Sequence, residues 1–276
     1  MKLATDASLA ASLSPVPSTT ACKICGAAAP LHGVVDFNKS CESSNGVHFP
    51  LSGVPVWYHR CTECRFLFSE QFDHWTPAMF RRHIYNESYP LVDPEMDGTR
   101  AKREAIPLLA LAGQVKASRV LDYGGGEGTL TRIMTGNGYE ATSWDPMRDG
   151  TLSPPPASFD IVTAYEVFEH TPTPSRTCQE ALSFARPGGL FLFSTLISDE
   201  LRTQACDHWY ISPRNGHISI HTTHSLRRLF AQLGWRVRHH GSSHHMAFAE
   251  SAPGQDDTPD RLINSAPRAT RSTSPD

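Results

Sequence analysis

The stretch Arg119-Val-Leu-Asp-Tyr-Gly-Gly-Gly-Glu-Gly-Thr-Leu130 decides the fold of this chain. A short apolar run ends in Asp122, three consecutive glycines follow, and a fourth glycine, Gly128, precedes Thr-Leu-Thr-Arg-Ile. Apolar residues that give way to glycines and then to a helical pattern predict a strand, a tight turn and a helix. Glycine permits positive φ at such a turn and lets the backbone approach a ligand, at which the N–H groups of the helix then point. The stretch therefore predicts a ligand-binding turn in a doubly wound α/β sheet.

The sequence of this turn argues against a dinucleotide as the ligand. A dinucleotide fingerprint requires glycine at the sixth position of Gly-x-Gly-x-x-Gly, and counted from Gly124 that position is Thr129. The pattern is instead Asp-x-Gly-x-Gly-x-Gly, which resembles motif I of the class I S-adenosylmethionine-dependent methyltransferases. In that family the turn holds the amino-acid end and the ribose of the cofactor.

Further segments occur in the order that this family shows. Asp145 ends the segment 139–145 and lies 23 residues after Asp122, where a doubly wound sheet places a carboxylate for ribose hydroxyls. Segments 158–170, 186–194 and 215–221 resemble the fourth strand with its acidic active-site segment, the turn into the fifth strand, and a loop before a helix expected over 225–233. The resemblance implies S-adenosylmethionine as the cofactor, bound through Asp122, Gly124, Gly126, Asp145 and Glu166.

One spacing departs from the family pattern. Only 14 residues separate Asp145 from Asp160, and Pro154-Pro-Pro156 lies among them. A crossover needs at least about 10–12 residues before the strand itself is counted. We therefore expect the third strand of the sheet to be trimmed or replaced by a loop, at the adenine end of the cofactor site.

The composition bounds the class of protein. The chain has 276 residues, 39% of them hydrophobic, and a formal net charge of −3. These values are typical of a soluble globular protein with one domain and a smaller module, and the lack of a basic excess disfavours nucleic acid as a partner. No apolar run reaches the ~18–20 residues that cross a bilayer. The first residues lack a secretory signal, so we expect a cytoplasmic protein with reduced cysteines and no membrane partner.

Four cysteines near the N-terminus form two C-x-x-C pairs, with 35 residues between the pairs: Cys22, Cys25, Cys61 and Cys64. Two such turns facing each other supply the tetrahedral set of thiolates that structural zinc prefers. A disulfide or a thioredoxin-like redox pair is the alternative, and the second pair argues against the redox hypothesis. Arg65 stands where a glycine is common after such a pair, and the lone Cys41 is expected to be a small buried residue.

A four-cysteine unit ahead of a class I core resembles the deoxysugar C-methyltransferases and related bacterial enzymes, in which this unit helps to cover the acceptor site. The resemblance implies methyl transfer to a small molecule, with a sugar or nucleotide-sugar as the first candidate. The alternatives are an O-methyltransferase of a lipid, quinone or other secondary metabolite, and a non-catalytic zinc-ribbon interaction protein. We expect disordered tails at 1–20 and 251–276, a zinc-binding unit at 21–70, a linking helix and loop at 71–100, and the core at 101–250. Within the linker, Tyr85 and Tyr89 either cover the bound ligands or pack a helix onto the core.

Methyl transfer requires a base for the acceptor's proton, because the sulfonium leaving group needs no protonation. His217, in Asn-Gly-His-Ile-Ser, matches a catalytic histidine of the sugar enzymes, although Gly216 replaces the Glu that precedes it there. Glu169 and His170 are further candidates. With Glu166 they also resemble the Mg²⁺ or Mn²⁺ site of small-RNA 2′-O-methyltransferases, which is the minority hypothesis. Among the histidines that follow His217, His221 and His224, at least one is expected on the surface.

Overall fold

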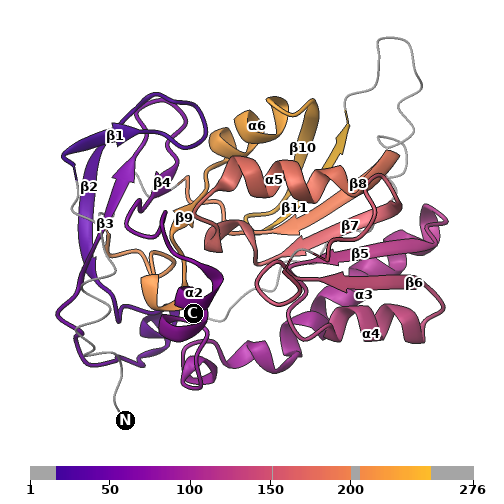
Figure 1. Cartoon of the computed structure of the whole chain (residues 1–276), viewed down its shortest axis with the longest axis horizontal. Helices are drawn as coiled ribbons and strands as arrows, with labels where there is room; N and C mark the ends of the chain where they lie inside the picture. The colour runs from indigo at the N-terminus through magenta and orange to yellow at the C-terminus, as the bar shows by residue number, and fades with distance from the viewer. Residues whose placement is uncertain (1–16, 151, 200–205, 250–276) are drawn as a thin grey trace, which may run out of the picture.

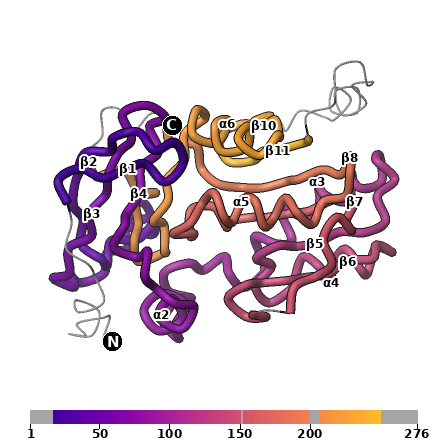
Figure 2. The backbone as a smooth tube through the Cα atoms, turned by 45° about the horizontal axis from the view of Figure 1, so that its top comes forward, coloured from indigo at the N-terminus to yellow at the C-terminus, as the bar shows by residue number. Residues whose placement is uncertain are grey.

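The computed structural model describes residues 17–150, 152–199 and 206–249, which form two sheets lying side by side (Figure 1, Figure 2). The strands are β1 (Thr19–Ala21), β2 (Ala28–Asp36), β3 (Pro55–Arg60), β4 (Leu67–Phe68), β5 (Arg119–Tyr123), β6 (Glu140–Trp144), β7 (Phe159–Tyr165), β8 (Ala185–Ser194), β9 (Ser219–Ile220), β10 (Trp235–His240) and β11 (His244–Ala249). The α-helices are α2 (Pro77–His83), α3 (Thr99–Gln114), α4 (Thr129–Gly136), α5 (Pro174–Ser183) and α6 (Thr223–Ala231). None of the helices in the described part of the chain has the length and apolar content that crossing a bilayer requires.

The larger sheet has six strands in the order β10-β11-β8-β7-β5-β6. Strands β6, β5, β7 and β8 are parallel, whereas β11 runs antiparallel to both β8 and β10. From β5 the chain turns to β6 on one side and then to β7 on the other, so the strand order reverses between β5 and β7. In open α/β sheets, ligands bind at the carboxyl ends of the strands at such a reversal. The predicted doubly wound α/β fold is confirmed.

The sheet stops at β6, as the spacing between Asp145 and Asp160 predicts. Among the described residues that follow β6, turns and loop lead directly to β7, and no strand lies beyond β6. The trimmed third strand is therefore confirmed. The cofactor site must be closed on that side by other parts of the chain.

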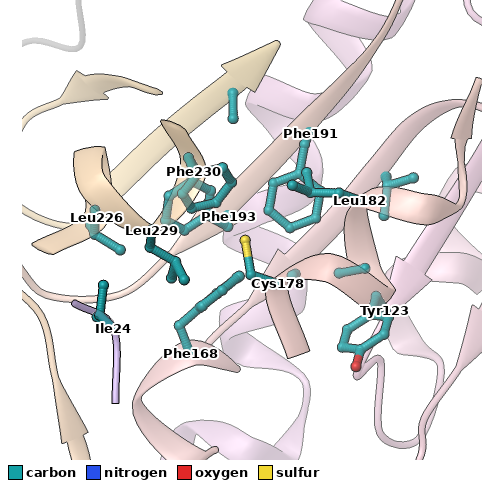
Figure 3. Packing of buried hydrophobic residues seen from close by; sticks show 14 of the residues in the cluster. Ile24, Tyr123, Phe168, Cys178, Leu182, Phe191, Phe193, Leu226, Leu229 and Phe230 are labelled. Carbon is teal, nitrogen blue, oxygen red and sulfur yellow. The ribbon is translucent and has the colours of Figure 1, made fainter. Parts of the chain in front are cut away.

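Helices cover both faces of this sheet, with α3 and α4 on one side and α5 and α6 on the other (Figure 1). Strand β8 shows why, because neighbouring residues of a strand point to opposite faces. Its Phe191 and Phe193 are fully buried in the cluster that contains α5 and α6, where Phe193 stacks on Phe230 with ring centroids 5.0 Å apart (Figure 3). Leu190 and Leu192 are buried in the cluster that contains α3 and α4.

The smaller sheet has the order β1-β2-β3-β4-β9, and its last strand, β9, comes from much later in the sequence than the other four. Ile220 and Ser219 of β9 pair antiparallel with Leu67 and Phe68 of β4. The N-terminal unit is therefore completed by a segment of the core, which a boundary at residue 70 does not foresee. The N-terminal unit also begins earlier than the expected residue 21, because Thr19 already pairs with Pro30. Residues 1–16 of the expected N-terminal tail and the whole expected C-terminal tail lie outside the described residues.

The linker between the sheets is less helical than its aromatic spacing suggests. Helix α2 is capped by Thr76, whose side chain accepts a hydrogen bond from the N–H of Met79, and it ends at His83. Tyr85 and Tyr89 thus lie beyond the helix, with their rings edge to face at 5.1 Å. Of the two alternatives for these tyrosines, the helical i,i+4 pair is therefore wrong, although the two rings do meet.

Candidate active site

The glycine turn after β5 depends on two glycines for different reasons. Gly124 has φ +72°, and a Cβ atom there would lie 2.7 Å from Cγ2 of Val167, in the loop after β7. Gly126 has φ +48° and no atom near its Cβ position, so only its backbone conformation requires glycine. The turn therefore lies directly against the loop after β7 and leaves Gly126 open to a ligand.

Two carboxylates flank this turn at different depths. Asp122 is buried, and its Oδ1 accepts a hydrogen bond of 2.9 Å from the Thr163 hydroxyl. Burial raises the pKa of Asp122 to about 7. Asp145 is half-buried at the tip of β6, where its Oδ2 accepts a hydrogen bond of 3.2 Å from the N–H of Gly126. Asp145 is thus placed to contact a ligand on the turn, whereas Asp122 supports the turn from below.

Glu166, the first residue after β7, is held in an unusual backbone conformation. Its φ of +54° is in the left-handed region, which costs a non-glycine residue free energy. Ser194, the last residue of β8, compensates through two hydrogen bonds. Its Oγ accepts from the Glu166 N–H at 2.9 Å and donates to Glu166 Oε1 at 2.7 Å. This role of Ser194 was not predictable from the sequence, because a serine at the end of a strand is common.

Glu169, His170 and His217 lie close together, with Glu169 and His217 buried and His170 half-buried; we call them the buried trio. One potential ligand atom from each lies within 4.8 Å of the others. Glu169 is completely buried, and among the described residues neither of its carboxylate oxygens has a hydrogen-bond partner. Nδ1 of His170 is likewise buried without a partner, whereas Nδ1 of His217 lies 3.0 Å from the carbonyl oxygen of Tyr210.

Burial favours the neutral form of each member of the trio. It raises the pKa of Glu169, an effect to which the charge of Glu166 adds. It lowers the pKa of His170, and it lowers that of His217 well below the usual histidine value, with His170 contributing to the latter. An unprotonated imidazole can accept a proton, so the trio offers a base at neutral pH.

Gly216 explains why this chain departs from the Glu-His pair of the sugar enzymes. Its φ is +88°, and a Cβ there would lie 3.0 Å from Nδ1 of His170 and 3.3 Å from the hydroxyl of Tyr85. Any side chain at position 216, glutamate included, would crowd both groups. Glycine at this position therefore allows His170 to lie close to the loop that carries His217.

Two tyrosines that the sequence analysis did not single out hold His217. The Tyr58 hydroxyl, on β3, donates a hydrogen bond of 2.6 Å to the carbonyl oxygen of His217. The Tyr210 ring lies 4.3 Å from the His217 ring, centroid to centroid. Cys41 also belongs to this region, since its Sγ lies 3.6 Å from Nδ1 of His217. The N-terminal unit therefore contributes directly to the surroundings of the buried trio.

The later histidines separate as expected. His221 is fully buried, with Nε2 3.4 Å from the carbonyl oxygen of Phe168 and its ring 4.8 Å from that of Phe66. His224 is exposed on α6. His221 thus packs the two sheets together and does not face the buried trio.

The four N-terminal cysteines lie together, with their sulfur atoms within 4.8 Å of one another. The Sγ–Sγ distances are 3.5 Å for Cys22–Cys64, 3.4 Å for Cys25–Cys61 and 3.7 Å for Cys25–Cys64. Four thiolates bound at ~2.3 Å to a tetrahedral zinc ion would be roughly 3.8 Å apart, so the cluster fits this metal. All four cysteines are free thiols. A thioredoxin-like redox pair opens a helix, whereas the first pair here leads into β2, so the redox alternative lacks the structure that it requires.

The sheet is doubly wound, one antiparallel strand, β11, lies between β8 and β10, and the glycine turn lacks the dinucleotide pattern. This is the architecture of the class I S-adenosylmethionine-dependent methyltransferases. Comparison with known proteins assigns the family. A family model described as a methyltransferase domain matches residues 96–240, just over half of the chain, and the chain belongs to this family.

The curated relatives carry one recurrent description. The chain is 29% identical over 110 residues to the "Ubiquinone biosynthesis O-methyltransferase" of Bordetella pertussis (strain Tohama I), a match that covers 31% of this chain and 45% of that protein. It is 49% identical over 41 residues to the protein of the same name from Azoarcus sp. (strain BH72), covering 15% of this chain and 18% of that protein. The chain thus matches less than half the length of these relatives.

Solved methyltransferase structures are more distantly similar. Human N-acetylserotonin methyltransferase in complex with S-adenosylmethionine is 17% identical, with a TM-score of 0.45, over 66% of this chain and 62% of that chain. An O-methyltransferase from neocarzinostatin biosynthesis in complex with S-adenosylhomocysteine is also 17% identical, with a TM-score of 0.41, over 59% and 60%.

Proposed function

We propose that this chain transfers a methyl group from S-adenosylmethionine to a hydroxyl oxygen of a small molecule. The observation that carries the proposal is the position of the buried trio next to the glycine turn. Val167, which packs against Gly124, lies two residues before Glu169, and the charge of Glu166 acts on Glu169 and His170. A base and a cofactor turn therefore share one edge of the sheet, as proton removal during methyl transfer requires.

The description shared by the curated relatives favours a hydroxylated aromatic or quinol-type acceptor over a sugar. The sequence analysis put the sugar first, from the resemblance to deoxysugar enzymes, and named a quinone as the alternative. The relatives support that alternative within the segment they share with this chain. A phenolic hydroxyl is also more acidic than a sugar hydroxyl, so a single histidine is a sufficient base.

Each candidate residue has a distinct task in this proposal. S-adenosylmethionine supplies a methyl group on a positively charged sulfur. Asp145 binds the ribose hydroxyls and the backbone of Gly124 and Gly126 lies along the ligand, while Asp122 and Glu166 fix the turn and its neighbouring loop. His217 takes the acceptor's proton at an imidazole nitrogen. Glu169 and His170 orient the acceptor in a space closed to water.

A second candidate function has one observation in its favour. Both oxygens of Glu169 and Nδ1 of His170 are buried without partners among the described residues, and buried polar groups normally have them. A divalent cation held by the buried trio would bind the acceptor oxygen and lower its pKa, so that His217 would act as a ligand and not as a base. The four-cysteine cluster is a separate matter, and we assign it structural zinc.

Incubation with methyl-labelled S-adenosylmethionine tests the function directly. The purified chain should transfer label from the cofactor to catechols or hydroquinones offered as pure acceptors, and the labelled product should release the phenol when the methyl ether is cleaved. Nucleotide-sugars under the same conditions should remain unlabelled. Label appearing on the nucleotide-sugars alone would return the acceptor to the sugar class, and no label on any acceptor or metabolite pool would contradict the enzyme assignment.

Asp145→Ala should weaken the binding of S-adenosylhomocysteine by tenfold to a hundredfold in calorimetry. The loss of an ionised hydrogen-bond partner costs ~1.5–3 kcal/mol, and each 1.4 kcal/mol is about tenfold in affinity. Glu140→Ala is the matched control, because Glu140 is an exposed carboxylate at the opposite end of β6 and should leave affinity unchanged. Equal affinity in both variants would remove Asp145 from the cofactor site.

A further inference from the structure

A groove that neither the cofactor nor the acceptor uses lies where the cysteine cluster meets the core. Its volume is about 610 Å³, which is within the usual range for small-molecule sites. The residues that line it come from β3, the second cysteine turn, the loop after β8 and the start of α6: Arg60, Glu63, Arg65, Asp199, Thr222, Thr223, His224 and Arg227. None of them belongs to the glycine turn or to the buried trio.

The groove carries one more positive than negative side chain. Its charged lining consists of three arginines, Arg60, Arg65 and Arg227, and two carboxylates, Glu63 and Asp199, and Arg60 already has a partner within the protein. The Asp199 carboxylate accepts hydrogen bonds from the N–H and the hydroxyl of Thr223, at 2.9 Å and 2.6 Å. Among the described residues, neither Arg65 nor Arg227 has an ion pair, so their guanidinium groups remain available to a ligand.

The backbone at Arg65 decides which substitution tests the groove. Arg65 has φ +63°, in the left-handed region that glycine occupies without strain. The position follows Cys64, and its conformation is set by the turn that brings that cysteine to the cluster. Glycine at this position would therefore remove the guanidinium and relieve backbone strain at the same time.

A second, closed cavity adjoins the groove, since Arg60, Arg65 and Thr222 line both. It is too small to admit a water molecule, and its wall includes Ser198 and His32. The polar atoms in that wall, the hydroxyl of Ser198 and Nε2 of His32, are therefore out of reach of a ligand in the groove, and binding depends on the side chains that line the groove itself.

We propose that this groove binds the phosphate group of an anionic small molecule, at a site separate from methyl transfer. Arginine presents its donors in a planar fork that matches phosphate oxygens, and guanidinium–phosphate hydrogen bonds are among the stronger ones in proteins. Arg65 lies on the cysteine turn and Arg227 on α6, and both line the groove, so a phosphate bound by both would connect the N-terminal unit with the core. The proposal does not depend on the identity of the methyl acceptor.

Calorimetric titration of the full chain with inorganic pyrophosphate, at low salt, tests this site. One molecule should bind per chain, and Arg65→Gly should weaken binding at least tenfold. This substitution removes the guanidinium and relieves the left-handed backbone, so the melting temperature should not fall. Arg227→Gln should weaken binding as well. Arg103→Ala is the matched control, because Arg103 is an exposed arginine of α3 that is paired with Glu95.

Three outcomes would overturn the proposal. The first is the lack of saturable binding. The second is equal binding by the wild-type chain and all three variants, which would mean an adventitious ion only. The third is succinate binding as tightly as pyrophosphate, which would show that the groove does not select phosphate. S-adenosylhomocysteine binding, measured on the same samples, should be identical in Arg65→Gly and wild type, so failure of this proposal is separable from failure of the proposed function.

Discussion

His217→Gln should lower methyl-transfer turnover by ~10²–10⁴-fold, the usual contribution of a positioned general base. Glutamine keeps an amide that can donate to the carbonyl oxygen of Tyr210, which lies 3.0 Å from Nδ1 of His217, so the fold is expected to survive. Affinity for S-adenosylhomocysteine should stay nearly unchanged, because His217 acts on the acceptor. Single-turnover kinetics with a catechol acceptor would measure the chemical step.

Two controls separate the base from the alternatives. His240→Gln changes an exposed histidine at the end of β10 and should leave turnover at the wild-type level. A chelator that leaves the zinc content intact should not change wild-type activity if His217 is a base; in the metal-assisted alternative it should abolish turnover, and Mg²⁺ or Mn²⁺ should restore it. Near-wild-type turnover in His217→Gln would transfer the role to His170 or Glu169.

Cys64→Ser should have the largest effect on stability. Structural zinc contributes an apparent ~10–16 kcal/mol in small zinc units, as much as the whole stability of a typical domain. Cys64 is completely buried, and serine is a poor zinc ligand. We expect the zinc content to fall from one per chain to almost none, and hydrogen exchange of β1–β4 to become rapid. Cofactor binding at the glycine turn should be affected less.

Cys41→Ser is the matched control for this prediction. The Cys41 sulfur lies beside His217 and is not a member of the cysteine cluster, so this variant should keep its zinc. Equal stability of the metal-free and metal-loaded wild-type chain would contradict the structural role. Zinc content by mass spectrometry and unfolding followed by circular dichroism measure the two quantities.

The sequence was sufficient for the parts of the fold that local chemistry specifies. The run of glycines after Asp122 predicts a turn with positive φ angles, because this preference is a property of glycine itself. The short spacing between Asp145 and Asp160 leaves no room for another strand and its helix. Strand β9 was not predictable, because the two residues Ser219 and Ile220 are too few to show any periodicity. Its pairing with β4 is fixed by tertiary packing alone.

Long-range contacts also explain what was missed at the site. Tyr58 holds His217 across 159 positions of sequence, and no spacing rule connects two residues so far apart. The glycine at position 216 departs from the Glu-His pair of the sugar enzymes, and its positive φ together with the nearness of His170 and Tyr85 accounts for it. His217, Glu169 and His170 were identifiable from their residue types, whereas their shared burial was not.

The pairing of Leu67 with Ile220 sets the order in which the chain can fold on the ribosome. The two residues are 153 positions apart, and at synthesis rates of ~5–20 residues per second this interval lasts roughly 8–30 s. During that time β4 is an unpaired edge, which is a surface that promotes aggregation. Early zinc capture by the cysteines would hold the strands together while they wait for β9. Expression in zinc-depleted medium should therefore lower the yield of folded protein. Removing zinc from protein that has already folded should have a smaller effect, on its lifetime.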